Sequence, residues 1–306
     1  MKVTIIGTGY MANGIGMRIV AGNHSLTIVG RNEGKARSLA KKLGKDVKWG
    51  NLSDKLSGDI IIFTLPYTGI PDVIKAYNTQ LSDKILVDIS NPVDLKTFEL
   101  TTPAGSSGAE EIAKLLPKGA KLIKAFNTTF AGILADRTVA GKWVDVFVAG
   151  DDQKAKKIVM RLVSDGALRA IDVGPLKHAR QLEGMQLIHM SLQKTLGTNG
   201  MSTIRIASPI DRTKKIETES YDKAVDNDTF TQNMLQMKKR TNSSPQSPGE
   251  RGSNSVSGLT PSPDSDDDVL QNAHQMGIAP DADLEHPKEL NIAKDVADAE
   301  RDLKYK

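Results

Sequence analysis

Short runs of apolar residues recur along roughly the first two thirds of this chain, and segments with helical periodicity separate several of them. Each run is bounded by Gly, Pro, Asn or Asp, which is typical of β-strands buried on both faces. The predicted strands are Val3–Ile6, Leu26–Val29, Ile60–Leu65, Ile85–Ile89, Leu122–Phe126, Val144–Ala149 and Leu168–Val173. Strands that alternate with helices predict an α/β fold with a doubly wound, mostly parallel sheet.

Two helices are predicted after residue 150. The first follows Asp151-Asp152, which we interpret as a helix cap and not as a metal site. The second begins at Gly174-Pro175-Leu176 and carries a stripe of apolar residues. We expect most of this stripe to pack in the core, and part of it could line a pocket or contact a second subunit. The stripe consists of Leu182, Met185, Ile188, Leu192 and Leu196.

The ends of the predicted strands are the place to look for a ligand, because sheets of this kind bind ligands beyond the carboxyl ends of their strands. After the first strand comes Gly7-Thr8-Gly9-Tyr10-Met11-Ala12, which fits the pattern G-x-G-x-x-G/A. Gly7 allows the tight turn, Gly9 lets a phosphate approach the backbone, and the following helix presents its positive end. This Rossmann-type turn predicts a dinucleotide.

The end of the second strand indicates which dinucleotide. NAD-preferring domains place an acidic residue there, whereas Arg accommodates the 2′-phosphate of NADP. The chain has Gly30-Arg31-Asn32, with Lys35 one turn into the next helix. We therefore predict NADP.

These features, taken in order, resemble the NADPH-dependent reductases of the deazaflavin coenzyme F420, and equally the cytosolic reductase domain of the STEAP metalloreductases. The resemblance covers roughly residues 1–206. Its markers are Gly7–Gly14, Gly30-Arg31 with Lys35, Asp88–Pro92, Lys124–Thr128, Val148–Asp151 and Asp172–Leu176. It implies hydride transfer between NADPH and a flavin or deazaflavin (F420, FMN or FAD), a small C-terminal α/β extension that closes the cleft, and a homodimer.

The resemblance also implies roles for single residues. Thr8, Gly9, Tyr10 and Met11 match the pyrophosphate loop, and Arg31 with Lys35 matches the 2′-phosphate contacts; members of the family often have Ser where this chain has Gly30. Leu65 and Pro66 match a strand end that flanks the cofactor. Ala125, Phe126 and Asn127 match the segment near the nicotinamide, although core packing of Phe126 and a turn role for Asn127 stay open. The full set of expected cofactor-binding residues is Gly7, Thr8, Gly9, Tyr10, Met11, Gly30, Arg31, Asn32, Lys35, Leu65, Pro66, Asn91, Ala125, Phe126 and Asn127.

No catalytic or metal-ligating residue is nominated. Hydride transfer to a flavin-like ring asks the protein mainly to hold two planar groups face to face. The strand ends offer Ser90, Asn91, Thr128 and Thr129. None of the five histidines forms a pair at the short spacing of a helical zinc site, and for His189 a helix-surface or core role is favoured over a place in the pocket.

Composition narrows the function classes. The chain has 306 residues, a formal net charge of +4 and no cysteine, which excludes disulfides, thiolate zinc sites and cysteine nucleophiles. Few aromatic residues lie among basic clusters, so nucleic-acid binding is not expected. We find neither a secretory signal nor a membrane span, and a cytoplasmic protein is expected.

The polar pattern predicts the domain organisation. We expect an NADP-binding reductase domain over 1–206, with about 151–206 as the cleft-closing and dimer part. Residues 207–268 read as a charged and then Ser/Pro-rich linker, and 269–306 as a tail with short helices that could bind an unknown protein. Two other functions stay open: an NADPH-dependent reductase of a small carbonyl or imine, and a non-enzymatic NADPH-sensing adaptor.

Overall fold

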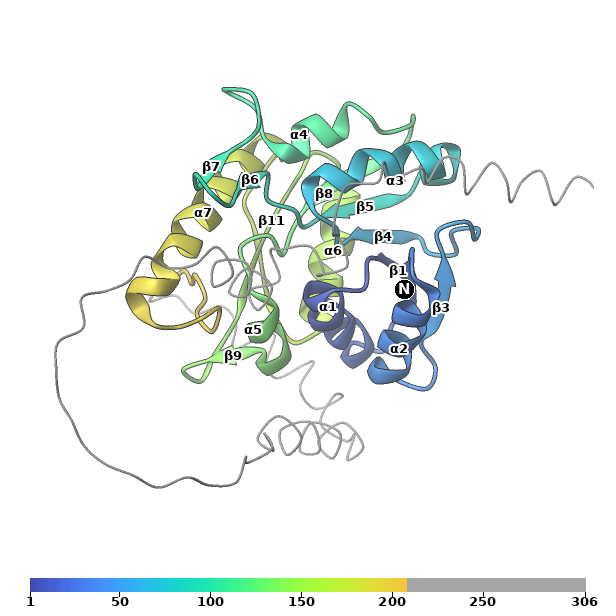
Figure 1. Ribbon diagram of the computed structural model, residues 1–306, viewed down its shortest axis with the longest axis horizontal. Helices are drawn as coiled ribbons and strands as arrows, with labels where there is room; N and C mark the ends of the chain where they lie inside the picture. Colours follow the sequence, from blue (N-terminus) through green and yellow to red (C-terminus); the bar gives the residue numbers. More distant parts are fainter. Residues whose placement is uncertain (208–306) are drawn as a thin grey trace, which may run out of the picture. The chain divides into compact units, whose positions relative to one another are not determined.

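A central sheet of eight strands organises the chain in the computed structural model, which describes residues 1–207 (Figure 1). The strand order is β12-β11-β8-β5-β4-β1-β2-β3. The strands are β1 (Lys2–Ile6), β2 (Ser25–Gly30), β3 (Lys48–Asn51), β4 (Ile60–Phe63), β5 (Ile85–Asp88), β8 (Lys121–Lys124), β11 (Asp145–Gly150) and β12 (Arg169–Asp172). The predicted doubly wound, mostly parallel sheet is confirmed.

Helices cover both faces of this sheet. They are α1 (Tyr10–Ala21), α2 (Glu33–Leu43), α3 (Ile70–Tyr77), α4 (Gly108–Ala113), α5 (Ala131–Asp136), α6 (Gln153–Asp165) and α7 (Ala179–Leu196), with short 3₁₀ turns η1 (Tyr67–Gly69), η2 (Asn78–Leu81) and η3 (Leu176–His178). Consecutive strand residues point to opposite faces, so Ile5 joins the apolar cluster under α1, α2 and α6, whereas Ile6 joins the cluster under α3 and α4. Both faces of the sheet are therefore buried, as the apolar runs predicted.

Two strands of the sheet, β11 and β12, run against the other six. β1, β2, β3, β4, β5 and β8 pair in parallel, but β11 pairs antiparallel with β8, with Ala149 opposite Lys124. Asp145, at the start of β11, therefore lies toward the edge at which β8 ends. The ligand is predicted at this same edge.

The predicted strand ends need small corrections. β4 stops at Phe63 and β8 at Lys124, each two residues before the predicted end. At Phe126 the backbone has φ +61°, a left-handed conformation that ends regular pairing. β3 and the small hairpins β6 (Val93–Asp94) with β7 (Glu99–Leu100) and β9 (Thr138–Val139) with β10 (Lys142–Trp143) were not predicted, because their residues form no apolar run.

The two helices predicted after residue 150 are present. Asp152 caps α6, since its carboxylate accepts a hydrogen bond from the Ala155 backbone N–H at 2.8 Å. For α7 the expected core packing is wrong for most of the apolar stripe: Leu182 is buried, but Ile188, Leu192 and Leu196 are 63%, 41% and 57% exposed. No helix within residues 1–207 is both long and apolar enough to cross a bilayer. The predictions for 208–306, including the linker and the tail helices, lie outside the described residues.

Candidate functional site

The turn between β1 and α1 can be built only with glycine at its first position. Gly7 has φ +130°, and a Cβ there would lie 2.3 Å from the Oγ1 atom of Thr64. Gly9 is the N-cap of α1 and has nothing within 4 Å of its Cβ position. No side chain caps α1 within the described part of the chain. The first amides of this 12-residue helix are therefore left to an external anion.

Gly30 is packed against the glycine turn. A Cβ at Gly30 would lie 2.7 Å from Cγ2 of Thr8, so the Ser expected at this position from the family resemblance would fit only if Thr8 moved. Sequence reasoning identified the departure from the family pattern but not its steric cause.

Arg31 and Asn32 have different local roles. Arg31 is exposed, and among residues 1–207 its guanidinium makes no hydrogen bond or ion pair. Asn32 instead caps α2, because its side-chain oxygen accepts a hydrogen bond from the Lys35 backbone N–H at 2.9 Å. Asn32 therefore fixes the start of the helix that carries Lys35, while Arg31 can reach a ligand.

The strand ends of β5 and β8 are joined by two amide side chains. Asn91 donates from Nδ2 to the Asn127 carbonyl at 2.9 Å, and Asn127 donates from Nδ2 to Oδ1 of Asn91 at 3.0 Å. Ala125 and Phe126 are buried in the main apolar cluster, so this segment offers backbone and not the Phe126 ring to the edge of the sheet. Beyond β4, Leu65 packs on the second apolar cluster, and Pro66 is exposed just before η1.

A buried cluster of three charged side chains lies beneath these loops. The ammonium of Lys124 donates to Asp88 at 2.8 Å, to Glu183 at 2.7 Å and to the Ser90 carbonyl at 2.6 Å, and none of the three charged side chains has exposed surface. Glu183 also accepts hydrogen bonds from the backbone N–H groups of Gly108 and Ala109 at the start of α4. The cluster thus connects β5, β8, α4 and α7.

Lys124 stays charged in this cluster. Burial opposes the charge on its ammonium, but Asp88 and Glu183 together outweigh burial and raise the pKa of Lys124 above its ordinary value. Sequence reasoning quoted Asp88 and Lys124 as family markers without assigning them a role, and it missed Glu183. One signal could have indicated this ion pair: each of two predicted strands contains one charged residue within its apolar run. The sheet pairs these two residues, Asp88 and Lys124.

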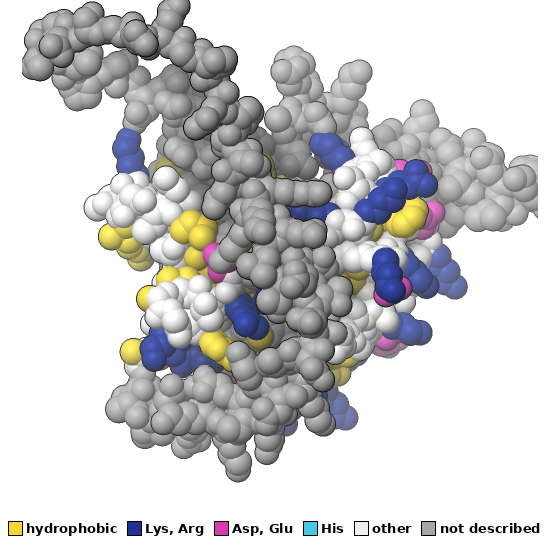
Figure 2. Space-filling view, turned by 90° about the horizontal axis from the view of Figure 1, so that it is seen from below, with side chains coloured by type: hydrophobic (Ala, Val, Ile, Leu, Met, Phe, Trp, Pro, Cys, Tyr) yellow, Lys and Arg dark blue, Asp and Glu magenta, His cyan; other side chains and the backbone are white. Residues whose placement is uncertain are grey.

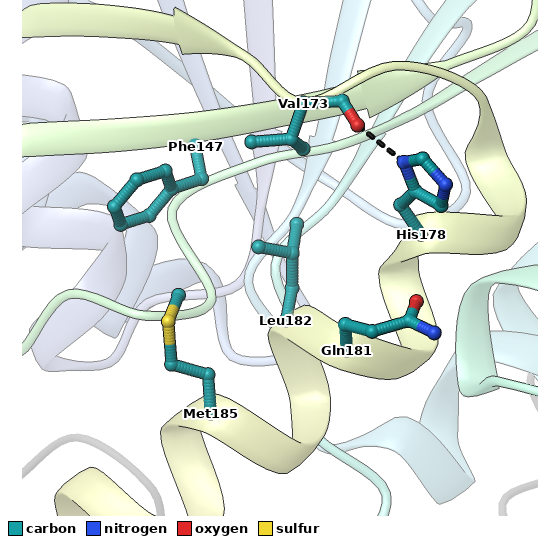
Figure 3. Close-up of a pocket in the computed structure, with 6 residues that line it drawn as sticks. All are labelled: Phe147, Val173, His178, Gln181, Leu182 and Met185. Carbon is teal, nitrogen blue, oxygen red and sulfur yellow. Dashed lines mark hydrogen bonds between the residues drawn. The ribbon is translucent and has the colours of Figure 1, made fainter. Parts of the chain in front are cut away.

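A cavity of about 400 Å³ lies between β11 and α7, and it was not predicted (Figure 3). Its lining is mainly apolar and consists of Phe147, Val173, His178, Gln181, Leu182 and Met185. The His178 ring hydrogen-bonds the Val173 carbonyl (Figure 3).

Most of the predicted residues meet at one edge of the sheet. The strands β1, β2, β4, β5 and β8 are adjacent and parallel. They are followed by Gly7–Met11, Arg31, Leu65-Pro66, Asn91 and Ala125–Asn127, and Gly30 is the last residue of β2. Figure 2 shows one face of the molecule, where Lys and Arg side chains occur in several separate places beside apolar ones.

Comparison with known proteins agrees with this geometry. The family model described as NADP oxidoreductase, coenzyme F420-dependent, matches residues 2–92. The F420-dependent NADP reductase of Methanocaldococcus jannaschii is 32% identical over 218 residues, which span 65% of this chain and 96% of that protein. The metalloreductase STEAP3 of Rattus norvegicus is 28% identical over 186 residues, or 61% of this chain and 36% of that protein.

Solved structures show the same likeness. A protein of Arthrobacter sp. FB24, described as an F420-dependent NADP reductase, is 27% identical, with a TM-score of 0.60 over 68% of this chain and 100% of that one. The hypothetical protein SMa0349 of Sinorhizobium meliloti is 30% identical, with a TM-score of 0.53 over 57% of this chain and 86% of that one. With nearly the full length of a curated relative matched and the glycine turn, Arg31 and the aligned strand ends in place, this chain belongs to the family of F420-dependent NADP reductases and is an oxidoreductase.

Proposed function

We propose that this protein transfers a hydride between NADPH and a flavin or deazaflavin acceptor of the F420 type. The observation that carries the proposal is the pairing of an uncapped α1 start with an exposed Arg31 at the end of the adjacent strand. The first offers amides to a pyrophosphate, and the second offers a guanidinium to the 2′-phosphate that distinguishes NADP from NAD.

The chain's own residues would hold the cofactor along the sheet edge. Thr8, Gly9, Tyr10 and Met11 would hold the pyrophosphate, and Arg31 with Lys35 would hold the 2′-phosphate. Leu65, Pro66 and Asn91 would flank the cofactor, and Ala125 would lie near the nicotinamide. When bound, this cofactor supplies the hydride; the protein supplies orientation.

The buried charge cluster makes that orientation rigid. Lys124 fixes the Ser90 carbonyl, and Asp88 accepts a hydrogen bond from the Ser90 N–H at 2.8 Å, so both groups hold the loop that leads to Asn91. Asn91 in turn holds Asn127. Hydride transfer needs the reacting atoms about 3–3.5 Å apart, and a fixed loop preserves that separation.

Steady-state kinetics tests this proposal. NADPH oxidation is measured with F420, FMN, FAD and ferric chelates, and in parallel with a panel of small carbonyl and imine compounds. We expect turnover with a flavin-type ring and faster oxidation of NADPH than of NADH. Turnover confined to the carbonyl or imine panel would contradict the proposal and favour the alternative reductase, and NADPH binding without turnover would favour the adaptor.

We further propose that the protein acts as a homodimer. The exposed apolar stripe Ile188, Leu192 and Leu196 on α7 supports this, because side chains at spacings of four residues form one continuous face. A cytoplasmic location and a protein partner for residues 269–306 stay predictions.

A further inference from the structure

Two charged side chains hold the backbone of Ile206, close to the end of the described residues. Arg169 and Asp145 form a two-pronged ion pair, in which Nε of Arg169 donates to Oδ1 of Asp145 at 2.6 Å. The same guanidinium donates to the Ile206 carbonyl at 2.6 Å, and the same carboxylate accepts a hydrogen bond from the Ile206 N–H at 2.9 Å. We call this arrangement the Ile206 clamp.

The Ile206 clamp lies on the side of the sheet that carries the candidate site. Asp145 begins β11 and pairs with Arg169 at the start of β12. Because Ala149 lies opposite Lys124, the last residue of β8, the first residues of β11 extend past the end of β8 on the site side. The Asp145 side chain has no exposed surface and that of Arg169 is 16% exposed, so salt screens this ion pair little.

Residues 197–206 form a strap between the end of α7 and the Ile206 clamp, and Gln193 fixes the first part of this strap. Nε2 of Gln193 donates to the Ser202 hydroxyl at 2.8 Å, and its Oε1 accepts from the Gly200 N–H at 2.9 Å. His189, which is buried on α7, hydrogen-bonds the same Ser202 hydroxyl at 2.8 Å. The strap is thus held at both ends, by amide and imidazole groups at one and by charges at the other.

Between its two ends the strap lies on the loop that joins β8 to α5. Thr203 pairs with Thr129 in an isolated antiparallel bridge. Met201 packs on Gly132, where an added Cβ would lie 2.7 Å from the Met201 sulfur. Thr129 follows Asn127 by two positions, and Asn127 ends the segment that is predicted to lie near the nicotinamide. The strap therefore covers the continuation of that segment.

The middle of the strap depends on its ends. The bridge between Thr203 and Thr129 joins a single pair of residues, too few contacts to repay the entropy of ordering the strap. Gln193 holds the chain before the bridge, and the Ile206 clamp holds the chain after it. Since the clamp binds only the backbone of Ile206, whose side chain is 52% exposed, it acts whatever side chain stands there.

We propose that Asp145 and Arg169 are positioning residues for the nicotinamide half of the cofactor. By holding Ile206 they keep the strap on the β8–α5 loop, and this loop keeps Asn127 in place at the edge of the sheet. The inference rests on the proposed function, since that function brings the nicotinamide to this loop. It adds that the strap, and not the glycine turn, determines how firmly the ring is held.

A proline at position 206 breaks the clamp without touching its charges. Ile206→Pro removes the N–H that Asp145 accepts and leaves the pair between Arg169 and Asp145 in place. Ile206→Ala is the matched control, because it keeps the N–H and removes only an exposed side chain. Arg169→Lys keeps the positive charge but loses the two-pronged geometry, and it replaces the proline variant if that variant does not fold.

The measurement is the fluorescence of NADPH bound to the full chain, because the reduced nicotinamide emits more strongly when a protein holds its ring rigidly. Calorimetry gives the Kd for NADPH, and NADPH oxidation with F420 and with FMN gives kcat. A displacement of about 1 Å costs up to roughly 100-fold in rate, so we expect Ile206→Pro to lower kcat roughly tenfold and the fluorescence of bound NADPH roughly twofold. The Kd should change less than about twofold, since the two phosphate sites lie at the glycine turn and Arg31. Ile206→Ala should match wild type in all three.

The inference is overturned if bound NADPH gains no fluorescence in wild type, or if Ile206→Pro keeps the wild-type fluorescence. It is equally overturned if Ile206→Ala has the same effect as Ile206→Pro, or if the Kd rises as much as the fluorescence falls. A loss of fluorescence confined to Ile206→Pro, in a protein that oxidises NADPH with neither F420 nor FMN, supports the inference and refutes the proposed acceptor instead.

Discussion

Lys124 and Glu183 form an ion pair of 2.7 Å across 59 positions of sequence, with no exposed surface on either side chain. The contact joins the strand that leads into the candidate site to the helix that borders it. Since the same ammonium also binds Asp88, the placement of α7 and the placement of two strand-end loops depend on one cation.

Removing Glu183 should therefore destabilise the whole domain. Glu183→Ala leaves the Lys124 charge only partly compensated in the core and frees two α4 amides, so we expect a loss of about 3 kcal/mol in the free energy of unfolding. Urea denaturation measures this loss. Lys114→Ala, which breaks the exposed pair with Glu111, is the control and should leave the midpoint unchanged; equal effects of the two variants would contradict the prediction.

Arg31 should determine the choice between NADP and NAD. Because a hydrogen bond to a charged group contributes about 1.5–3 kcal/mol, Arg31→Ala should raise the Kd for NADP roughly 10- to 100-fold and leave that for NAD unchanged. Calorimetry with both cofactors gives the two constants. The matched control is Arg37→Ala, whose guanidinium lies 5.3 Å from the centre of the Trp49 ring and should not affect the ratio.

Replacing Gly30 by Ser should destabilise this chain. Gly30→Ser places a Cβ against Cγ2 of Thr8, and overpacking of this kind costs about 1–3 kcal/mol. We expect a lower Tm and weaker NADP binding. The double variant Thr8→Ser with Gly30→Ser removes the obstructing methyl group and should recover both; if the single variant binds NADP as well as wild type, the packing argument fails.

The exposed stripe on α7 should control the oligomeric state. Ile188→Glu together with Leu192→Glu puts charge on the apolar face, and light scattering coupled to gel filtration should then report half the wild-type mass. Ile158→Glu on α6, where the side chain is 39% exposed, serves as the control and should leave the mass unchanged. A monomeric wild type would refute the dimer.

Stability should fall in mild acid because of His189. Burial lowers the pKa of this imidazole below its ordinary value of 6.5, although a hydrogen bond with the Thr128 backbone opposes the shift. The folded state then binds fewer protons than the unfolded state, so stability is present above pH 6.5 and is lost as the pH falls below it. Urea midpoints at pH 7.5 and 5.5 should differ less in His189→Gln than in wild type; an identical difference would show that this histidine is not responsible.

The fold could be predicted because its signals are local. An apolar run bounded by Gly or Asn specifies a buried strand whatever surrounds it, and Asp152 caps α6 through contacts only three residues away. That Gly7, Arg31 and Asn91 lie at one edge of the sheet could be predicted as well, because parallel strands all end at the same edge.

What sequence reasoning missed depends on contacts between distant residues. Glu183 looked like one polar position on a helix, because only the fold brings it to Lys124. Ile188, Leu192 and Leu196 looked like core residues, since apolar periodicity cannot tell a face packed on the sheet from one left open. The cavity beside Met185 could not be predicted from the sequence, because its lining comes from β11, the residue that follows β12, and two helical segments.

The reversed direction of β11 places the turn after it away from the candidate site. Because β11 runs against β8, the Asp151-Asp152 turn that follows it emerges on the side of the sheet opposite the ends of β1, β5 and β8. Evolution or an engineer could therefore lengthen that turn, or graft another module into it, without rebuilding the chemistry on the far rim.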